Sequence, residues 1–261
     1  MKWSNEYKVH YYYTDYNTVL KSSYIARYMQ ETAWYALKNW GPTPEYLTEN
    51  NLAFILIKIN FKYYEEIHED DTIKVQTWAN PPKGLIFPRN YRIYKGDKIA
   101  AEAVSSWVLM DSKDKNIVRP DDYKNKDEFM AYDDEELDFT VQRRIKMPED
   151  MNEYDEYKVK YSDIDTNFHM NNVAYIDVIC NNLYNDNDIM SPELKKKMLS
   201  LELNYINEAK FAQTIEINKG TVICSISDDN KGETTEEYYM KAKVKGSEHG
   251  CFEAKVVLTN K

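Results

Sequence analysis

Polar side chains alternate with apolar ones in the stretch YSDIDTNFHMNN, residues 161–172. Every second position carries a polar group, in the order Asp163, Asp165, Asn167 and His169. An extended backbone sends alternate side chains to opposite faces, so these groups would share one face. An imidazole exchanges a proton near neutral pH, and a carboxylate does so where apolar surroundings raise its pKa. The stretch is therefore either a strand with one wet face or a site for general acid–base chemistry.

Two asparagines, Asn171 and Asn172, indicate that a helix begins directly after this stretch. Asparagine is favoured at the N-cap, and the first N–H groups of a helix carry the positive end of its dipole. Such N–H groups can stabilise charge on a carbonyl oxygen, so we expect an oxyanion site here. The alternative is that one asparagine caps the helix and the other is merely exposed. The apolar residues that follow recur at three- and four-residue steps, at Val173, Ile176, Ile179, Cys180 and Leu183.

Metal binding is another use of the same polar residues. Asp163, Asp165 and His169 could supply ligands, but no second histidine stands at the spacing of a metal site. We therefore expect neither a metal nor another cofactor. Asp163 is expected to support the local turn. The alternative for His169 is an ordinary polar residue beside a helix cap.

The chain also repeats itself. The segments YKVHYYYTDYN and YKVKYSDIDTN begin at positions 7 and 157, which are 150 residues apart. At this offset the first copy keeps the aspartate and the asparagine, as Asp15 and Asn17, but has Val19 where the second copy has His169. We therefore expect the first copy to have kept the fold and lost catalysis.

A second shared block follows each predicted helix. The strand-like stretches 61–75 and 203–217 align without a gap at an offset of 142, and Glu66 then matches Glu208. Each copy ends in a hairpin with alternating apolar residues, after turns that contain Gly96 and Gly246. Each copy thus reads as one strand, one long helix and about four antiparallel strands.

This order of elements predicts the fold class. A single helix buries its apolar stripe only against the concave face of such a sheet. The sequence therefore predicts an α+β protein with two tandem units, at 1–120 and 157–261, joined by a charged linker at 121–156.

The composition excludes several classes of function. The chain has 261 residues, of which 43% are hydrophobic and 30% are charged, as in a globular protein. Its net charge of −10 argues against nucleic-acid binding. It has no apolar run of membrane-spanning length, no signal-peptide core, and no CxxC spacing among Cys180, Cys224 and Cys251. We therefore expect a cytoplasmic protein with reduced thiols and without nucleic-acid or membrane partners.

The polar stretch at 161–172 and the two repeated units resemble the acyl-acyl-carrier-protein (acyl-ACP) thioesterases. These enzymes terminate fatty acid synthesis in plant plastids and many bacteria. In that family a tandem pair of hot-dog domains carries a D-x-N-x-H-x-N-N segment before the second long helix, and this chain has DTNFHMNN at 165–172. The family also has a glutamate in the following strand, in a context similar to LNYINEAK at 203–210. The resemblance implies a tandem double hot-dog fold and active-site roles for Asp165, Asn167, His169 and Glu208.

One position departs from the family pattern. Plant members carry a cysteine after the glutamate, assigned as a nucleophile, but this chain has Ala209. Water is therefore the expected nucleophile, with Glu208 or His169 as its base and Asn167 orienting the water or its activating carboxylate. The alternative for Glu208 is a solvated strand residue. The three cysteines are expected to be structural thiols.

The function that the resemblance implies is hydrolysis of fatty acyl-ACP thioesters to free fatty acid and carrier protein. The first unit would line the acyl-chain pocket with residues 25–34 and 54–57, which ordinary core packing explains equally well. Two alternatives stay open: an acyl-CoA thioesterase on the same fold, and a non-catalytic acyl-binding protein. The acyl-chain preference and the oligomeric state, including a homodimer, also stay open.

An acidic carrier protein needs a basic surface on an enzyme of net charge −10. Two short clusters could supply it, and a merely solvated face is the alternative for each. The clusters are Arg143, Arg144 and Lys146 in the linker, and Lys195, Lys196 and Lys197 after the second helix.

Overall fold

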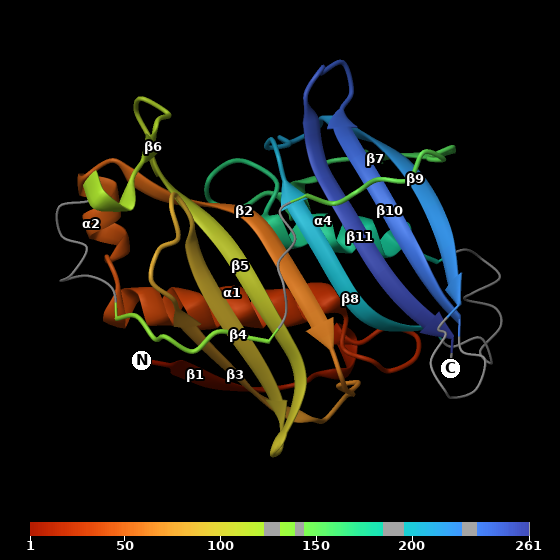
Figure 1. Ribbon diagram of the computed structural model, residues 1–261, viewed down its shortest axis with the longest axis horizontal. Helices are drawn as coiled ribbons and strands as arrows, with labels where there is room; N and C mark the ends of the chain where they lie inside the picture. Colours follow the sequence, from red (N-terminus) through yellow and green to blue (C-terminus); the bar gives the residue numbers. More distant parts are fainter. Residues whose placement is uncertain (123–130, 139–143, 185–195, 226–233, 261) are drawn as a thin grey trace. The chain divides into compact units, whose positions relative to one another are not determined.

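The computed structural model forms two compact units, Met1–Val141 (unit 1) and Gln142–Lys261 (unit 2). It describes residues 1–122, 131–138, 144–184, 196–225 and 234–260. Each unit curves an antiparallel sheet around one long helix, α1 in unit 1 and α4 in unit 2 (Figure 1). The boundary between the units falls within the predicted linker 121–156. The assignment of functional roles to 1–120 and 157–261 stays a prediction.

The strands of unit 1 follow the order β1-β3-β4-β5-β2. Its central strands are long and antiparallel, and β6 pairs with β5. The strands are β1 (Trp3–Lys8), β2 (Leu52–Tyr63), β3 (Thr72–Ala79), β4 (Phe87–Lys95), β5 (Lys98–Asp111) and β6 (Ile117–Val118). The helical segments are η1 (Tyr11–Tyr13), α1 (Ser22–Trp40), α2 (Pro44–Glu49) and η2 (Pro120–Asp122).

Unit 2 repeats this topology, because its order β8-β11-β10-β9-β7 corresponds strand for strand to β2-β5-β4-β3-β1. The repeated order confirms that the sequence repeat is a structural repeat. Its strands are β7 (Glu153–Lys158), β8 (Lys196–Tyr205), β9 (Thr214–Ser225), β10 (Thr234–Val244) and β11 (Gly250–Asn260). Its helical segments are η3 (Tyr161–Asp163) and α4 (Asn172–Asn181).

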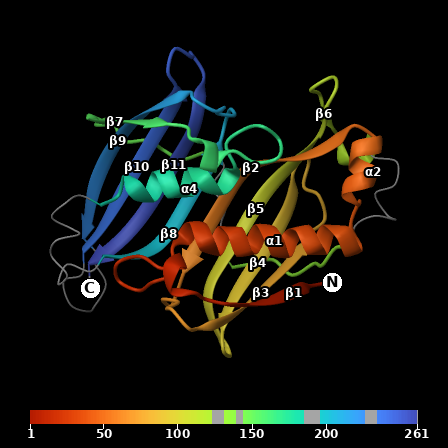
Figure 2. The same ribbon diagram turned by 180° about the vertical axis from the view of Figure 1, so that it is seen from behind.

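Both helices lie along the concave face of their own sheet, which Figure 2 shows from behind. The buried residues of α1 recur at helical spacing, and in unit 2 the facing strand residues Leu203, Ile217 and Phe252 have no exposed surface. Burying one such side chain contributes about 1.5–3 kcal/mol, so these faces hold each helix in place. The predicted hairpins are also present, with Gly96 and Gly246 at positive φ in the turns. Among the described residues, no helix is long and apolar enough to cross a membrane.

Two local expectations are wrong. The stretches 61–75 and 203–217 are not continuous strands, because each contains the end of one strand, a loop and the start of the next. The loops precede β3 and β9 and contain Asp70 and Ala212, whose φ values of 64° and 66° interrupt an extended backbone. Glu66 and Glu208 therefore lie in loops rather than in strands.

Candidate active site

A tight loop, rather than a strand, brings Asp165 and His169 together. The Asp165 N–H donates to the His169 carbonyl oxygen at 3.1 Å, and the Phe168 N–H donates to the Asp165 carbonyl oxygen at 3.1 Å. The carboxylate of Asp165 accepts from the Asn167 N–H at 2.9 Å, which favours a turn over an extended chain. Phe168 completes the turn with φ 64°. Of the two alternatives for this stretch, the strand with one wet face is therefore excluded.

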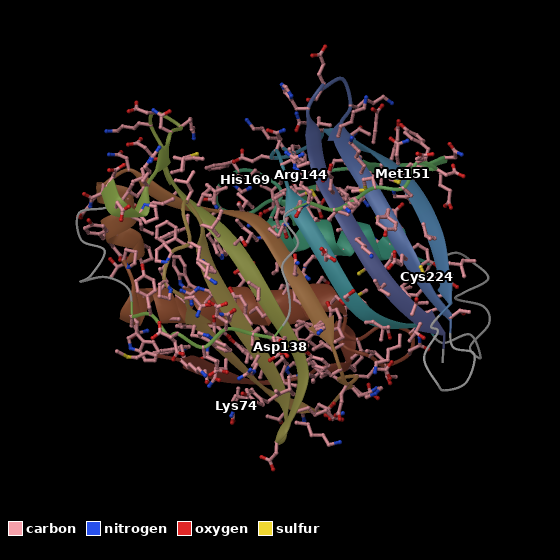
Figure 3. The ribbon with its side chains drawn as sticks, in the orientation of Figure 1. Lys74, Asp138, Arg144, Met151, His169 and Cys224 are labelled. Atoms are coloured by element: carbon pink, nitrogen blue, oxygen red, sulfur yellow. The ribbon has the colours of Figure 1, made fainter. Side chains whose placement is uncertain are left out.

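The imidazole of His169 lies between two carboxylates. Its Nδ1 is 3.8 Å from Asp165 Oδ1, and its Nε2 is 3.9 Å from Glu208 Oε1. Both distances are within ion-pair range but too long for a direct hydrogen bond. His169, labelled in Figure 3, is 21% exposed, whereas the side chain of Glu208 is 57% exposed. The three groups thus form a partly open cluster that a water molecule can reach.

The loop that carries Glu208 is fixed through its neighbour Ala209. The Met170 N–H donates to the Ala209 carbonyl oxygen at 2.8 Å, and the Ala209 N–H donates to the hydroxyl of Tyr175 at 3.0 Å. Ala209 has no exposed surface. Tyr175 lies on α4, so this helix and the histidine loop together set the position of Glu208. Sequence reasoning missed Tyr175, because its regular place in the apolar run of α4 gives no sign of this contact.

The start of α4 separates the roles of the two asparagines. Asn171 is the N-cap, and its Oδ1 accepts from the Val173 N–H at 2.9 Å. Its Nδ2 also lies 3.5 Å from Asp165 Oδ2, which ties the helix start to the loop of Asp165 and His169. Asn172 is the first helical residue, and among the described residues its N–H has no acceptor. That N–H is a donor available for an oxyanion.

The remaining predicted residues lie at the edge of this cluster. Asp163 accepts from the Lys160 N–H and the Tyr157 hydroxyl, both at 2.7 Å, so it supports the turn. Burial and the hydrogen bond to Asp163 raise the pKa of Tyr157. The side chain of Asn167 is exposed, and the structure holds this residue through its backbone N–H.

The three cysteines lie on a helix and two strands of unit 2. Cys251 is fully buried, and burial raises the pKa of its thiol to about 11, which disfavours the thiolate. Its Sγ lies 3.3 Å from the Asn207 carbonyl oxygen, directly before Glu208. Cys180 and Cys224 are half-buried on α4 and β9.

Unit 1 repeats the loop geometry with a different histidine. The Asp15 carboxylate accepts from the Asn17 and Val19 N–H groups at 2.8 and 3.1 Å. Burial raises the pKa of Asp15. The imidazole near this loop belongs to His68, whose Nε2 is 3.8 Å from Glu66 Oε2. Sequence reasoning missed His68, although the offset of 142 aligns it with position 210, two residues after the glutamate.

The sequence is similar to proteins of a known family over most of its length. The sequence matches the profile of the acyl-ACP thioesterase N-terminal domain over residues 1–126 and that of the acyl-ACP thioesterase C-terminal domain over residues 146–256. It has no significant match among curated proteins.

Two solved structures have the same fold. An acyl-ACP thioesterase from Bacteroides thetaiotaomicron is 20% identical, with a TM-score of 0.77, and the similarity covers 98% of this chain and 97% of that one. The 12:0-ACP thioesterase from Umbellularia californica is 14% identical, with a TM-score of 0.80, over 100% and 94% of the two chains. The predicted α+β fold with two hot-dog units is therefore confirmed.

Proposed function

Because the chain belongs to the acyl-ACP thioesterase family and is therefore a thioester hydrolase, we propose that it releases free fatty acid from acyl carrier protein at the Asp165–His169–Glu208 cluster. The observation that supports this site is the imidazole held between two carboxylates at the N-terminus of α4. This arrangement combines a proton acceptor, an orienting carboxylate and an N–H donor within one loop and one helix start.

The tautomer of His169 determines how water would bind. Its Nδ1 lies 3.3 Å from the Met170 carbonyl oxygen, which only accepts hydrogen bonds, so Nδ1 carries the proton. Nε2 is then an acceptor that faces the carboxylate of Glu208 at 3.9 Å. Two acceptors at this separation suit one water molecule that donates a hydrogen bond to each. Its oxygen lone pairs then point away from both, toward an incoming thioester.

Hydrolysis follows from this placement. The water oxygen attacks the thioester carbonyl carbon while one of its protons passes to His169 Nε2. The carbonyl oxygen becomes an oxyanion, which the N–H of Asn172 stabilises at the positive end of the α4 dipole. Collapse of this intermediate breaks the carbon–sulfur bond. The proton on His169 then passes to the departing thiolate, and Asp165 stabilises the transient imidazolium.

Glu208 therefore binds and orients the water. Glu66, the matched residue of unit 1, provides a control. We expect Glu208→Gln to lower kcat for acyl-ACP by about 10²-fold, because a neutral amide orients the attacking water less well and misplacing a reacting group can cost about that factor. Glu66→Gln makes the same change in the other unit and should leave kcat within a factor of about 2. Equal effects of the two substitutions would contradict the assignment of the site to unit 2.

The carrier is the next part of the proposal. Arg143 and Lys195 lie outside the described residues, and Lys196 pairs with Glu236 at 3.0 Å. Arg144, which Figure 3 labels, and Lys146 are both exposed, and neither forms an ion pair within the described part of the chain. These two side chains are therefore better suited to receive an acidic carrier.

A charge reversal at Arg144 and Lys146 tests whether these residues receive the carrier protein. A comparison of two substrates then tests which carrier the enzyme uses. Arg144→Glu combined with Lys146→Glu should raise KM for acyl-ACP several-fold and leave kcat unchanged, because rim charges act mainly on association. Acyl-CoA, assayed side by side, should be a poorer substrate in the unaltered protein. Equal turnover of the two substrates would favour the acyl-CoA thioesterase instead.

The acyl chain is proposed to lie in unit 1 between α1 and its sheet. Ile25, Tyr28 and Met29 are buried on the inner face of α1, whereas Trp34 is 49% exposed. This role for residues 25–34 and 54–57 has the same support as ordinary core packing. A change in the chain length of the released fatty acid on Met29→Ala would favour the acyl-pocket role.

A further inference from the structure

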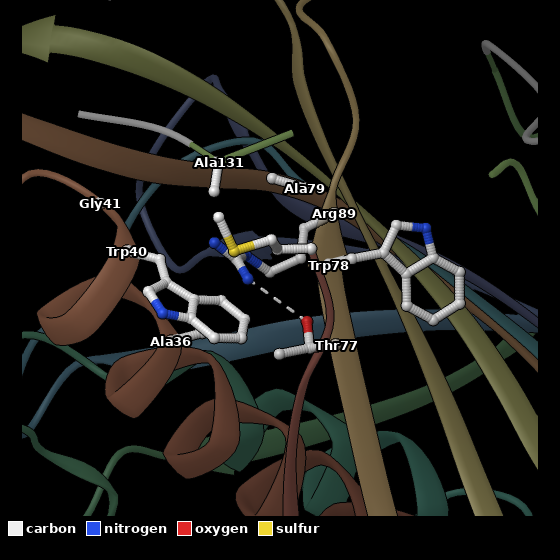
Figure 4. A pocket seen from close by; sticks show the side chains of 9 residues that line it. Ala36, Trp40, Gly41, Thr77, Trp78, Ala79, Arg89 and Ala131 are labelled. Atoms are coloured by element: carbon white, nitrogen blue, oxygen red, sulfur yellow. Dashed lines mark hydrogen bonds between the residues drawn. The ribbon is translucent and has the colours of Figure 1, made fainter. Parts of the chain in front are cut away.

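A guanidinium group that has no anionic partner among the described residues lies inside unit 1. Arg89 of β4 pairs with Ala79 of β3, and its side chain lies between the sheet and α1. Figure 4 shows its guanidinium between Trp40 and Thr77. Its Nη1 donates to Thr77 Oγ1 at 3.3 Å. No carboxylate of the described residues lies within ion-pair distance of it, and burial lowers the pKa of Arg89.

The guanidinium borders a small cavity. The volume of this cavity is about 10 Å³, which is room for one water-sized group. Arg89 itself is half-buried, so part of this residue stays in contact with solvent. Apart from Arg89 and Thr77, the side chains that line it are apolar or aromatic. They include Ala36, Trp40, Trp78 and Ala79.

A second arginine on the same strand shows the contrast. Arg92 donates from Nε to Glu102 at 2.7 Å and from Nη1 to Glu135 at 2.5 Å. Burial acts to lower its pKa, but these two carboxylates raise it overall. One strand thus carries a doubly paired arginine and, three residues earlier, an arginine whose one partner within the described part of the chain is a neutral hydroxyl.

The chemistry of Arg89 indicates which ligand would fit. Burying a charge without a partner is unfavourable, because the lost hydration is not offset by an ion pair. A guanidinium offers five N–H donors in one plane, and this plane matches a carboxylate. A phosphate carries more charge and needs more donors than one arginine and one hydroxyl provide. The apolar lining further favours a ligand with a hydrocarbon stem.

We propose that Arg89 binds the carboxylate of a free alkanoate, with one carboxylate oxygen in the cavity and the alkyl stem along the indole of Trp40 at its opening. A free fatty acid, the product of the proposed reaction, has this chemistry. The binding nevertheless depends only on residues of unit 1, and it requires no turnover in unit 2. Its test is therefore a binding measurement, whose outcome is separate from that of the hydrolysis assays.

The test uses octanoate as the probe on the full chain, with thermal unfolding and calorimetric titration as readouts. Octan-1-ol is the control ligand, because it has the same stem without the charge, and phosphate is the control anion. Arg89→Met removes the unpaired charge. Arg92→Met is the matched control, because it removes an equal charge from the same strand at a residue that does not line the cavity itself, although its guanidinium packs against the lining residue Trp78.

Octanoate is expected to raise the Tm of the unaltered protein, and octan-1-ol and phosphate are not. The Arg92→Met variant should start from a lower Tm and keep the octanoate shift. Arg89→Met should weaken octanoate binding at least tenfold without lowering the Tm of the free protein. Arg89→Lys keeps the charge and loses the planar fork, so it should bind more weakly than the unaltered protein.

Two outcomes would overturn the proposal. One is an equal effect of octanoate and octan-1-ol on the unaltered protein, a comparison that needs no variant. The other is full retention of octanoate binding in folded Arg89→Met protein, which would place the ligand elsewhere. If Arg89→Met does not fold, full-strength binding by Arg89→Lys would count against the carboxylate fork.

Discussion

Tyr175→Phe tests whether the hydroxyl of Tyr175 holds the Glu208 loop in position, because it leaves the carboxylate of Glu208 itself unchanged. The substitution removes only the hydroxyl that accepts the Ala209 N–H at 3.0 Å. The aromatic ring, which packs edge-on against Tyr205 and Phe252, is unchanged. Tyr175 is 3% exposed and Ala209 has no exposed surface, so water does not readily replace the lost acceptor.

The expected magnitude follows from this burial. Leaving a buried N–H without an acceptor costs about 1–3 kcal/mol. If the loop stays in place, this energy is lost from the free energy of unfolding. If the loop moves so that the N–H reaches water, Glu208 leaves its position near His169 Nε2 and the rate falls instead. Since about 1.4 kcal/mol corresponds to a factor of ten, we expect a loss of about tenfold in kcat or an equivalent loss of stability.

Urea unfolding and steady-state hydrolysis of acyl-ACP measure these two effects together. Tyr239→Phe is the control, because it removes a hydroxyl of the same unit that bonds Glu237 at 2.6 Å on β10. This control should lose some stability and keep its kcat. A Tyr175→Phe variant with both unaltered stability and unaltered kcat would refute the anchoring of the Glu208 loop.

Three further predictions concern thiols, capping and acid stability. Replacing all three cysteines by serine should leave hydrolysis within a few-fold of the original rate, and a folded but inactive triple variant would contradict a water nucleophile. Asn171→Ala removes the cap on the Val173 N–H and should cost about 1 kcal/mol in urea unfolding, whereas Asn172→Ala removes no side-chain cap. Burial acts to raise the pKa of Asp71, but its bonds with Lys95 and a backbone N–H lower it overall. The stability from this carboxylate is fully present above the ordinary carboxyl pKa and is lost as pH falls through the lowered one. Asp71→Asn should therefore flatten the acid dependence of unfolding, and an unchanged slope would contradict this.

The repeat made the architecture predictable from sequence. Two copies of one pattern gave the order of the elements, and glycines at matched positions marked the hairpin turns. Asn171 was predictable as a helix cap, because its side chain acts on the next turn of the same segment. Local chemistry of this kind depends on neighbours within a few residues.

Features that depend on distant contacts could not be predicted in the same way. Alternation at 161–172 favoured a strand, but the Asp165 carboxylate bonds its own backbone and closes a turn. The placement of Glu208 in a loop depends on contacts of Ala209 with Tyr175 and Met170, which are far from it in sequence. The lack of an ion pair for Arg89 among the described residues likewise becomes evident only from the structure.

The most direct test of catalysis in unit 2 compares two histidines. His169→Ala should lower kcat/KM for acyl-ACP by at least about 10²-fold, because it removes the group that accepts the proton of the attacking water. His68→Ala removes the imidazole near the corresponding loop of unit 1 and should leave kcat/KM close to its original value. Hydrolysis that survives His169→Ala but is lost on His68→Ala would place the active site in unit 1 and contradict the account.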